Sequence, residues 1–129
     1  MVFVDSDFFI GLYIIKDAHH KVCLKLGKSL KENLITSWDV IDEVVTKLRY
    51  YDSKSTALRF ISDIEKQNIP IIYPNHAYNK KARNIFEKQS KKHVSLTDCM
   101  NMAIAKEKNI KDFLSFDKIY ERNGFKLIK

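Results

Sequence analysis

The sequence predicts a single α/β domain in which helices cover both faces of a mainly parallel sheet. Short apolar segments alternate with amphipathic segments along the 129 residues, as in strands joined by helical crossovers. The chain contains no internal repeat, no low-complexity segment and no linker rich in proline or glycine. This length also favours one domain. We therefore expect residues 1–129 to form one three-layer α/β/α sandwich around a five-stranded sheet.

The first half of the chain contains two predicted strands, each followed by helices. Val2–Val4 is a β-branched and aromatic run, which is typical of a buried strand. Ser6 or Asp7 can cap the short apolar helix that follows it. An amphipathic helix comes next, and Leu34–Trp38 is predicted to be the second strand. Asp39 can then cap another helix.

The second half repeats the alternation of helices and strands. Ser53 and Asn75 can each start a helix, and Ser95 or Thr97 can cap a later one. The helix after Ser53 has a regular apolar face, as expected for a helix that packs on a sheet. Three more strands are predicted, at Ile69–Tyr73, Phe113–Phe116 and Phe125–Ile128.

The chain is strongly basic. It has 23 lysine and arginine residues against 16 aspartate and glutamate residues, a formal net charge of +7. Such a charge favours anionic partners through long-range attraction, although solubility alone is an equally good explanation. Lysine-rich surfaces bind nucleic-acid phosphates, but a solvated helix face is the ordinary alternative. One segment contains a single acid, Glu87, among six basic residues: Lys80, Lys81, Arg83, Lys88, Lys91 and Lys92.

Neither a membrane segment nor a zinc site is expected. No apolar run approaches the roughly 20 residues that span a bilayer, and the N-terminus lacks the basic start of a signal peptide. The two cysteines, Cys23 and Cys99, stand outside any Cys-x-x-Cys or Cys/His pattern. Cys99 lies in an apolar stretch and is predicted to be a core thiol. A cytoplasmic protein fits these features.

Four carboxylates stand just after apolar segments. Asp5 and Asp117 follow predicted strands, Glu43 follows the second strand, and Asp98 lies in the first turn of a helix. Ligands of open α/β sheets bind outside the carboxyl ends of the strands, so acids spread along the chain can meet there. Carboxylate oxygens are the ligands that Mg²⁺ and Mn²⁺ prefer. A basic protein with such an acidic point is typical of a metal-dependent nuclease.

Each of these acids also has an ordinary structural interpretation. Asp5 and Asp117 can cap helices or form turns. Asp98 is favoured by the dipole at the start of its helix. Glu43 and its neighbour Asp42 both lie off the apolar stripe of their helix, and periodicity does not choose between them. The joint placement of the acids, and no single one of them, indicates a metal site.

Polar neighbours of these acids are candidates to orient them. The hydroxyls of Ser6, Thr97 and Ser115 stand next to or near the carboxylates, although capping explains them equally well. Asn101 lies one helical turn after Asp98 and therefore on the same face. It is a candidate site contact, with simple surface exposure as the alternative.

At these residues the chain resembles the PIN-domain ribonucleases, particularly the small VapC-type toxins, over nearly its whole length. The second matching stretch selects Glu43 over Asp42. Asp7 departs from the family, in which many members have a neutral polar residue there, so it either joins the site or caps a helix. The matching stretches are Phe3-Val4-Asp5-Ser6-Asp7, Ile35-Thr36-Ser37-Trp38 with Asp42-Glu43-Val44-Val45, Ser95-Leu96-Thr97-Asp98, and Leu114-Ser115-Phe116-Asp117-Lys118 with Tyr120 and Gly124.

The resemblance implies a ribonuclease that uses Mg²⁺ or Mn²⁺, with metal-binding and catalytic roles for Asp5, Glu43, Asp98 and Asp117. It also implies a homodimer and a cognate antitoxin that inserts a segment into the active-site groove. Alternatives are a housekeeping PIN-type nuclease or DNase, and a catalytically silent PIN-like or receiver-like binding module. A receiver domain needs a lysine near the end of its last strand, whereas the late strand here ends in Asp117.

Overall fold

The computed structural model describes all 129 residues and contains five strands and seven helices. All strand pairs are parallel, and the order in the sheet is β3-β2-β1-β4-β5. The prediction of a mainly parallel five-stranded sheet is therefore confirmed. The strands are β1 (Val2–Val4), β2 (Leu34–Ser37), β3 (Ile71–Ile72), β4 (Asp112–Leu114) and β5 (Lys126–Leu127). The helices are α1 (Ser6–Tyr13), α2 (His20–Ser29), α3 (Trp38–Tyr51), α4 (Lys54–Lys66), α5 (His76–Glu87), α6 (Leu96–Glu107) and α7 (Ile119–Arg122).

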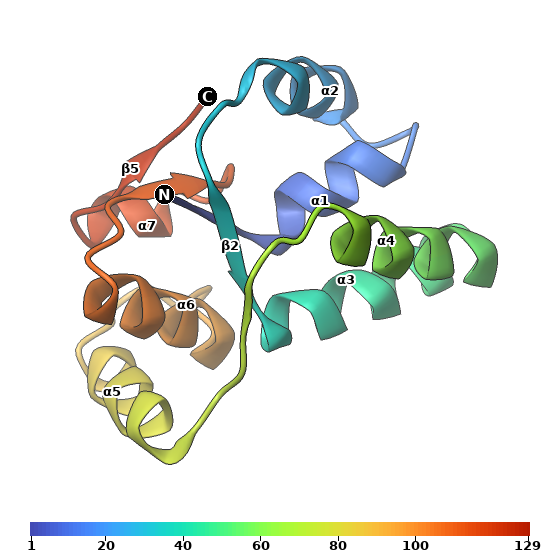
Figure 1. The fold of residues 1–129 in the computed structure, drawn as a ribbon. Helices are drawn as coiled ribbons and strands as arrows, with labels where there is room; N and C mark the ends of the chain where they lie inside the picture. Colours follow the sequence, from blue (N-terminus) through green and yellow to red (C-terminus); the bar gives the residue numbers. More distant parts are fainter.

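The helices form two groups on opposite sides of β2 (Figure 1). The helices α1 to α4 are one group, in which α1 contacts α2 and α3, and α3 contacts α4. The second group contains α5 and α6, which pack against each other, while α7 lies beside β5. This arrangement is the predicted three-layer α/β/α sandwich.

The central strand β1 organises the core. Val2, Phe3 and Val4 are all buried, as expected for a parallel strand that has helices on both faces. Phe3 lies 5.0 Å from Phe113 of β4, measured between ring centroids, and Phe113 stacks on Tyr120 of α7 at 4.1 Å. These aromatic contacts tie β1, β4 and α7 together, directly beneath the carboxyl end of β1.

Most predicted helix starts are confirmed, because capping depends on local sequence. The side chains of three predicted residues each accept a hydrogen bond from a backbone N–H in the first turn of their helix: Ser53, Asn75 and Ser95.

Two predicted caps are wrong. Asp5, and neither Ser6 nor Asp7, caps α1 by accepting a hydrogen bond from the Ser6 N–H. Ser37, and not Asp39, caps α3, because β2 ends at Ser37 and Trp38 is already helical. The residue that caps α1 directly follows the end of β1, and the residue that caps α3 is the last residue of β2. The strand therefore passes into the helix without a loop.

The strand β4 is shifted toward the N-terminus relative to its prediction. Its pairing with β1 ends at Leu114, opposite Val4. Ser115 Oγ then accepts a hydrogen bond from the Asp117 N–H at 3.1 Å, which turns the chain away from the sheet. Ser115 and Asp117 consequently lie in the connection from β4 to α7 and not in a strand.

Two further expectations concern membranes and cysteines. No helix has both the length and the apolar character required to cross a bilayer. Cys99 is buried and unpaired, as predicted, and so is Cys23.

The packing of α1 against α2 predicts opposite effects for two glycine substitutions. A Cβ at Gly11 would lie 2.5 Å from Cys23 Sγ, whereas a Cβ at Gly27 would meet only Leu12 Cδ2, at an ordinary 3.6 Å. We expect Gly11→Ala to lower the free energy of unfolding by about 1–3 kcal/mol through overpacking. Gly27→Ala should raise it by roughly 0.4–1 kcal/mol, because alanine restricts the unfolded chain.

Urea unfolding measures both changes. In a double-mutant cycle, Cys23→Ala should recover part of the Gly11→Ala loss, because it removes the sulfur that clashes. A Gly11→Ala variant as stable as the wild type would show that α1 and α2 do not pack this closely.

Candidate active site

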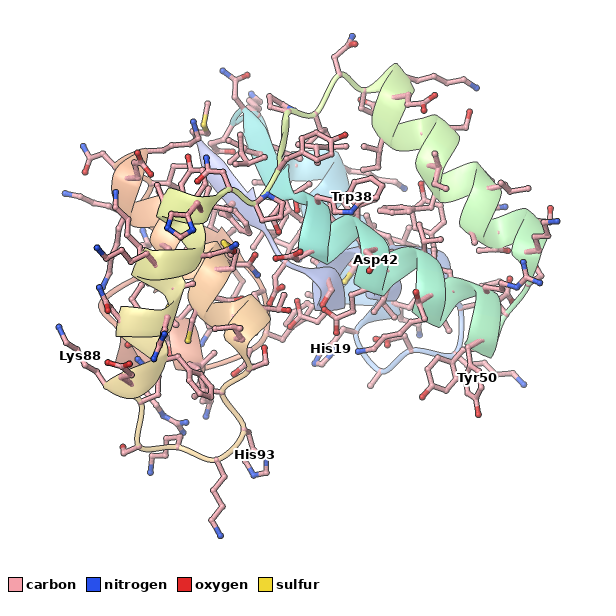
Figure 2. The ribbon with its side chains drawn as sticks, turned by 90° about the horizontal axis from the view of Figure 1, so that it is seen from below. His19, Trp38, Asp42, Tyr50, Lys88 and His93 are labelled. Atoms are coloured by element: carbon pink, nitrogen blue, oxygen red, sulfur yellow. The ribbon has the colours of Figure 1, made fainter.

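The predicted acids lie where the strands end. Asp5 follows β1, Glu43 lies in α3 directly after β2, Asp98 lies in the first turn of α6, and Asp117 follows β4. The strand β2 points downward in Figure 1, and Figure 2 views the molecule from below, onto this edge. The topology therefore brings residues from distant parts of the chain to one edge of the sheet.

The Asp5 carboxylate is buried and accepts hydrogen bonds at both oxygens. Asp5 as a whole is 6% exposed to solvent. Oδ1 accepts from the Ser6 N–H at 2.8 Å and from Asn101 Nδ2 at 3.3 Å. Oδ2 accepts from the Tyr120 hydroxyl at 2.9 Å and lies 3.2 Å from Ser115 Oγ. These donors come from three separate parts of the chain, and they hold the carboxylate in one orientation.

Asn101 extends this network to β2. Its Oδ1 accepts a hydrogen bond from Ser37 Oγ at 2.9 Å, and its Nδ2 also donates to the Tyr120 hydroxyl oxygen at 3.1 Å. The interpretation of Asn101 as a surface residue is wrong, since it is 0% exposed. Its spacing from Asp98 was the available sequence signal for its place in the site. No pattern in the sequence indicated the bond between Tyr120 and Asp5.

Asp7 fastens the connection between β4 and α7 to α1. Its Oδ2 accepts a hydrogen bond from the Phe116 N–H at 2.8 Å and lies 3.0 Å from Ser115 Oγ. Ser115 has one hydroxyl hydrogen, so it donates to Asp7 or to Asp5 but not to both at once. Asp7 Oδ1 is buried without a hydrogen-bond partner. Burial raises the pKa of Asp7.

Asp98 and Asp117 each use one oxygen for local structure. Asp98 Oδ2 accepts from the Ser95 N–H at 2.9 Å, and Ser95 Oγ accepts from the Asp98 N–H at 3.0 Å, which completes a capping box. Asp117 Oδ1 accepts from the Ile119 N–H at 3.0 Å. The ordinary structural interpretations therefore hold in part: Asp98 lies in the first turn of α6, and Asp117 forms a turn before α7, whose N-cap is Lys118. They do not exclude a binding role, because a carboxylate has a second oxygen.

The acids act on one another electrostatically. Burial raises the pKa of Asp5 to about 8, and the negative charges of Asp7 and Asp98 add to the rise. Burial also raises the pKa of Asp98, to which the charges of Asp117 and Glu43 contribute. Asp98 is thus within electrostatic range of each of the other three predicted acids. Such a concentration of like charge favours binding of a cation.

Glu43 is paired with a lysine that sequence analysis did not select. Lys47 Nζ lies 2.9 Å from Glu43 Oε1, one helical turn further along α3. This hydrogen bond raises the pKa of Lys47, and the negative charge of Asp5 raises it further. The ammonium group therefore lies at the acidic edge and offsets part of its charge. The four-residue spacing of Glu43 and Lys47 was the sequence signal for this pair.

The acids do not form a closed metal cage. No group of three or more histidine, cysteine, aspartate or glutamate side chains is arranged to hold a metal ion directly. The donors nevertheless suit a hard cation that keeps several waters, as Mg²⁺ usually does. The unpartnered Asp7 Oδ1 and the charges that raise the pKa of Asp98 both indicate negative charge that the protein alone does not neutralise.

The remaining predicted residues are divided between the site and other surfaces. Ser6 contacts Asp5 through its backbone N–H, and Ser115 contacts it through its hydroxyl. Thr97 lines a separate shallow pocket together with Asp39 and Met100. Of the basic segment, Lys91 and Lys92 line a hollow that also includes Asp117. Two other members form ion pairs along or beside α5: Lys81 with Glu107 and Arg83 with Glu87, both at 3.4 Å.

Without divalent metal, the protein should lose stability as the pH rises. The pKa of Asp5 is raised from 3.8 to about 8. The folded state therefore holds a proton in this window that the unfolded state releases, and the free energy of unfolding falls with pH. One such group contributes up to about 1.4 kcal/mol per pH unit.

Urea unfolding in EDTA between about pH 5 and about pH 8 measures this slope. Asp5→Asn should flatten it, and Asp42→Asn, an exposed neighbour of the site, should not. A wild-type slope in the Asp5→Asn protein would assign the pH dependence to another group.

Known proteins are similar to this chain in both sequence and structure. A VapC ribonuclease of Archaeoglobus fulgidus is 28% identical over 120 residues, which cover 88% of this chain and 75% of the relative. The structure of VapC20, a sarcin-ricin loop cleaving toxin of Mycobacterium tuberculosis, matches with a TM-score of 0.90 at 22% identity and covers 97% of this chain and 96% of that one. A chain of a toxin-antitoxin complex from Klebsiella pneumoniae matches with a TM-score of 0.73 at 10% identity, over 100% of this chain and 97% of that one.

The structural matches have low sequence identity and therefore establish the fold alone. The family model of the PIN domain, in contrast, matches residues 2–126, almost the whole chain. The chain belongs to the PIN domain family.

Proposed function

We propose that this protein is a metal-dependent endoribonuclease and the toxin of a toxin-antitoxin pair. The observation that carries the proposal is the buried Asp5 carboxylate, oriented by four donors and electrostatically coupled to Asp98 at the carboxyl edge of a PIN domain. The similarity to a VapC ribonuclease and to chains of toxin-antitoxin systems supports the reaction and the biological role.

In the proposed site, Asp5, Asp98 and Asp117 hold one or two Mg²⁺ or Mn²⁺ ions, directly or through water. When bound there, such a cation would supply Lewis-acid chemistry, acidifying water and offsetting charge on the scissile phosphodiester. Glu43 completes the site and orients the attacking water. Hydrogen bonds to Asp5 from its buried neighbours keep the carboxylate aimed at the cation.

The proposed substrate is RNA, which the basic surface attracts. The net charge of +7 favours encounter with a polyanion, and lysine and arginine side chains neutralise backbone phosphates. Presence of all four acids disfavours a catalytically silent scaffold. The residues proposed to contact RNA are Lys80, Lys81, Arg83, Lys88, Lys91 and Lys92.

The proposed partners are a cognate antitoxin and a second copy of the chain. The similarity to a chain of a toxin-antitoxin complex supports an antitoxin, which we place in the active-site groove. An exposed aromatic pair supports a homodimer: Trp38, at the start of α3, is 43% exposed and stacks at 5.5 Å on Tyr73, which follows β3. We place the protein in the cytoplasm, where its two unpaired cysteines would stay reduced.

Replacing Asp5 should abolish cleavage while leaving the fold intact. In Asp5→Asn the oxygen facing Ser6 and Asn101 remains, and the hydroxyls of Tyr120 and Ser115 can turn to accept from the new amide. We expect the rate of RNA cleavage with Mg²⁺ or Mn²⁺ to fall at least about 100-fold, because a ligand is lost. Asp42→Asn makes the same charge change at an exposed position of α3, and this control should cleave like the wild type. An active, folded Asp5→Asn protein would refute the site.

Divalent metal should stabilise the fold through these same acids. A ligand that binds only the folded state at roughly 100 times its Kd adds about 2.7 kcal/mol to the free energy of unfolding. We expect Mg²⁺ or Mn²⁺ to raise the melting temperature of the wild type. The rise should be much smaller in Asp98→Asn, because this variant lacks the Asp98 charge that acts on Asp5. An equal rise in both proteins would place the cation elsewhere.

A further inference from the structure

Two adjoining hollows beside Asp117 are lined by basic side chains. The smaller hollow, of about 290 Å³, includes Lys91, Lys92, Asp117 and Arg122 in its lining. The larger one, of about 350 Å³, shares Lys91 and Arg122 and adds Lys88 and Lys106. Because the two share part of their walls, they form one concave surface. We call this surface, bounded by Lys88, Lys91, Lys106 and Arg122, the basic hollow.

The four cations of the basic hollow have no acidic partner. The ion pairs of the molecule involve other residues, and Asp117 is the single acid that lines either hollow. Lys81 and Arg83, from the same basic segment of the sequence, are instead neutralised by Glu107 and Glu87. The structure thus separates a segment that looks uniform in sequence into a paired part and an unpaired part.

Hydrogen bonds hold the wall of the basic hollow in place. The side-chain amides of Gln89 and Asn123 bond to each other twice, at 2.9 and 3.1 Å. Gln89 also donates to the Ile85 carbonyl and Asn123 to the Ile119 carbonyl, so the end of α5 is tied to the end of α7. Lys88 and Arg122 each stand one residue before these amides. The positive charges are therefore carried on elements whose relative position is fixed.

We propose that the basic hollow binds a backbone phosphate of the RNA beside the one that is cleaved. This inference rests on the proposed function, because Asp117 belongs both to the proposed metal site and to the inner wall of the hollow. Arginine and lysine are the side chains that bind phosphate, and Arg122 can do so with two parallel hydrogen bonds. The hollows are each at or near the lower limit of roughly 300–1,000 Å³ for ligand pockets, which suits a phosphate with part of its ribose.

The position of the basic hollow predicts the path of the RNA across the molecule. In Figure 2, Lys88 and His93 lie at the two ends of the connection from α5 to α6, on the opposite side from Asp42 and Tyr50 of α3. The strand would leave the acidic edge past Asp117 and continue toward this connection. The paired residues Lys81 and Arg83 would contribute less to RNA binding than the unpaired cations of the hollow, because acidic neighbours compensate their charges.

Two double variants with the same change in net charge test the proposal. Lys91→Gln with Arg122→Gln removes two cations of the hollow, and Lys25→Gln with Lys28→Gln removes two from α2, outside it. All four residues are exposed, so both proteins should unfold at the wild-type urea concentration. The probe is a fluorescein-labelled oligouridylate of about 12 nucleotides, and its anisotropy is followed in EDTA, which prevents metal-dependent cleavage.

The hollow variant should bind the oligouridylate about 10-fold or more weakly than the wild type at low salt. Between about 50 and 200 mM KCl, the slope of log Kd against log salt should fall by about 0.7, the value for one lost phosphate contact to a single strand. The α2 variant should stay within about twofold of the wild type and keep its slope. Equal weakening in the two variants would overturn the proposal, as would tighter wild-type binding of a DNA duplex of equal length.

Cleavage with Mg²⁺ separates this proposal from the proposed function. If the wild type cleaves RNA and the hollow variant binds the probe normally, the basic hollow is wrong and the function stands. If the hollow variant loses binding as expected but the wild type cleaves no RNA, the phosphate site stands and the nuclease assignment falls.

Discussion

The buried carboxylate of Asp5 is the constraint on which the rest of the structure depends. It ends the central strand, caps α1 and accepts hydrogen bonds from α6 and α7 and from the connection after β4. Asn101 and Tyr120 are themselves fully buried, so each would have an unsatisfied polar group without this network. The fold and the proposed active site therefore share one set of interactions.

The same network carries an electrostatic cost that explains the charge distribution. Burying Asp5 beside Asp7 and Asp98 raises its pKa, which means that ionising this carboxyl costs free energy when no cation is bound. Lys47, which lies in α3, offsets part of the negative charge of the acids. The basic hollow lies next to Asp117. The protein is thus basic overall and acidic at one edge. The proposed RNA substrate would be attracted by the overall charge, and the proposed divalent cation would lie between its phosphate and the acids.

Hydrogen bonding at a helix start and the proposed metal binding are compatible uses of the same aspartates. Asp98 completes the capping box of α6 with one oxygen, and Asp117 stabilises the turn before α7 with one oxygen. In each case a local hydrogen bond fixes the side chain while the other oxygen remains available. A helix start placed directly after a strand holds an acid at the sheet edge with few rotatable bonds. This geometry explains why ordinary capping sequences and a proposed metal site occur at the same positions.

The sequence by itself determined the α/β class, the parallel sheet, the helix starts at Ser53, Asn75 and Ser95, and the placement of acids after strands. These features follow from periodicity and capping, which act over a few residues. Only the tertiary structure decided that Asn101 is buried against Asp5, that Asp7 holds the connection after β4, and that the basic segment is divided into paired and unpaired charges. Each of these depends on contacts between residues far apart in the chain, because helical spacing identifies a face but not what covers it.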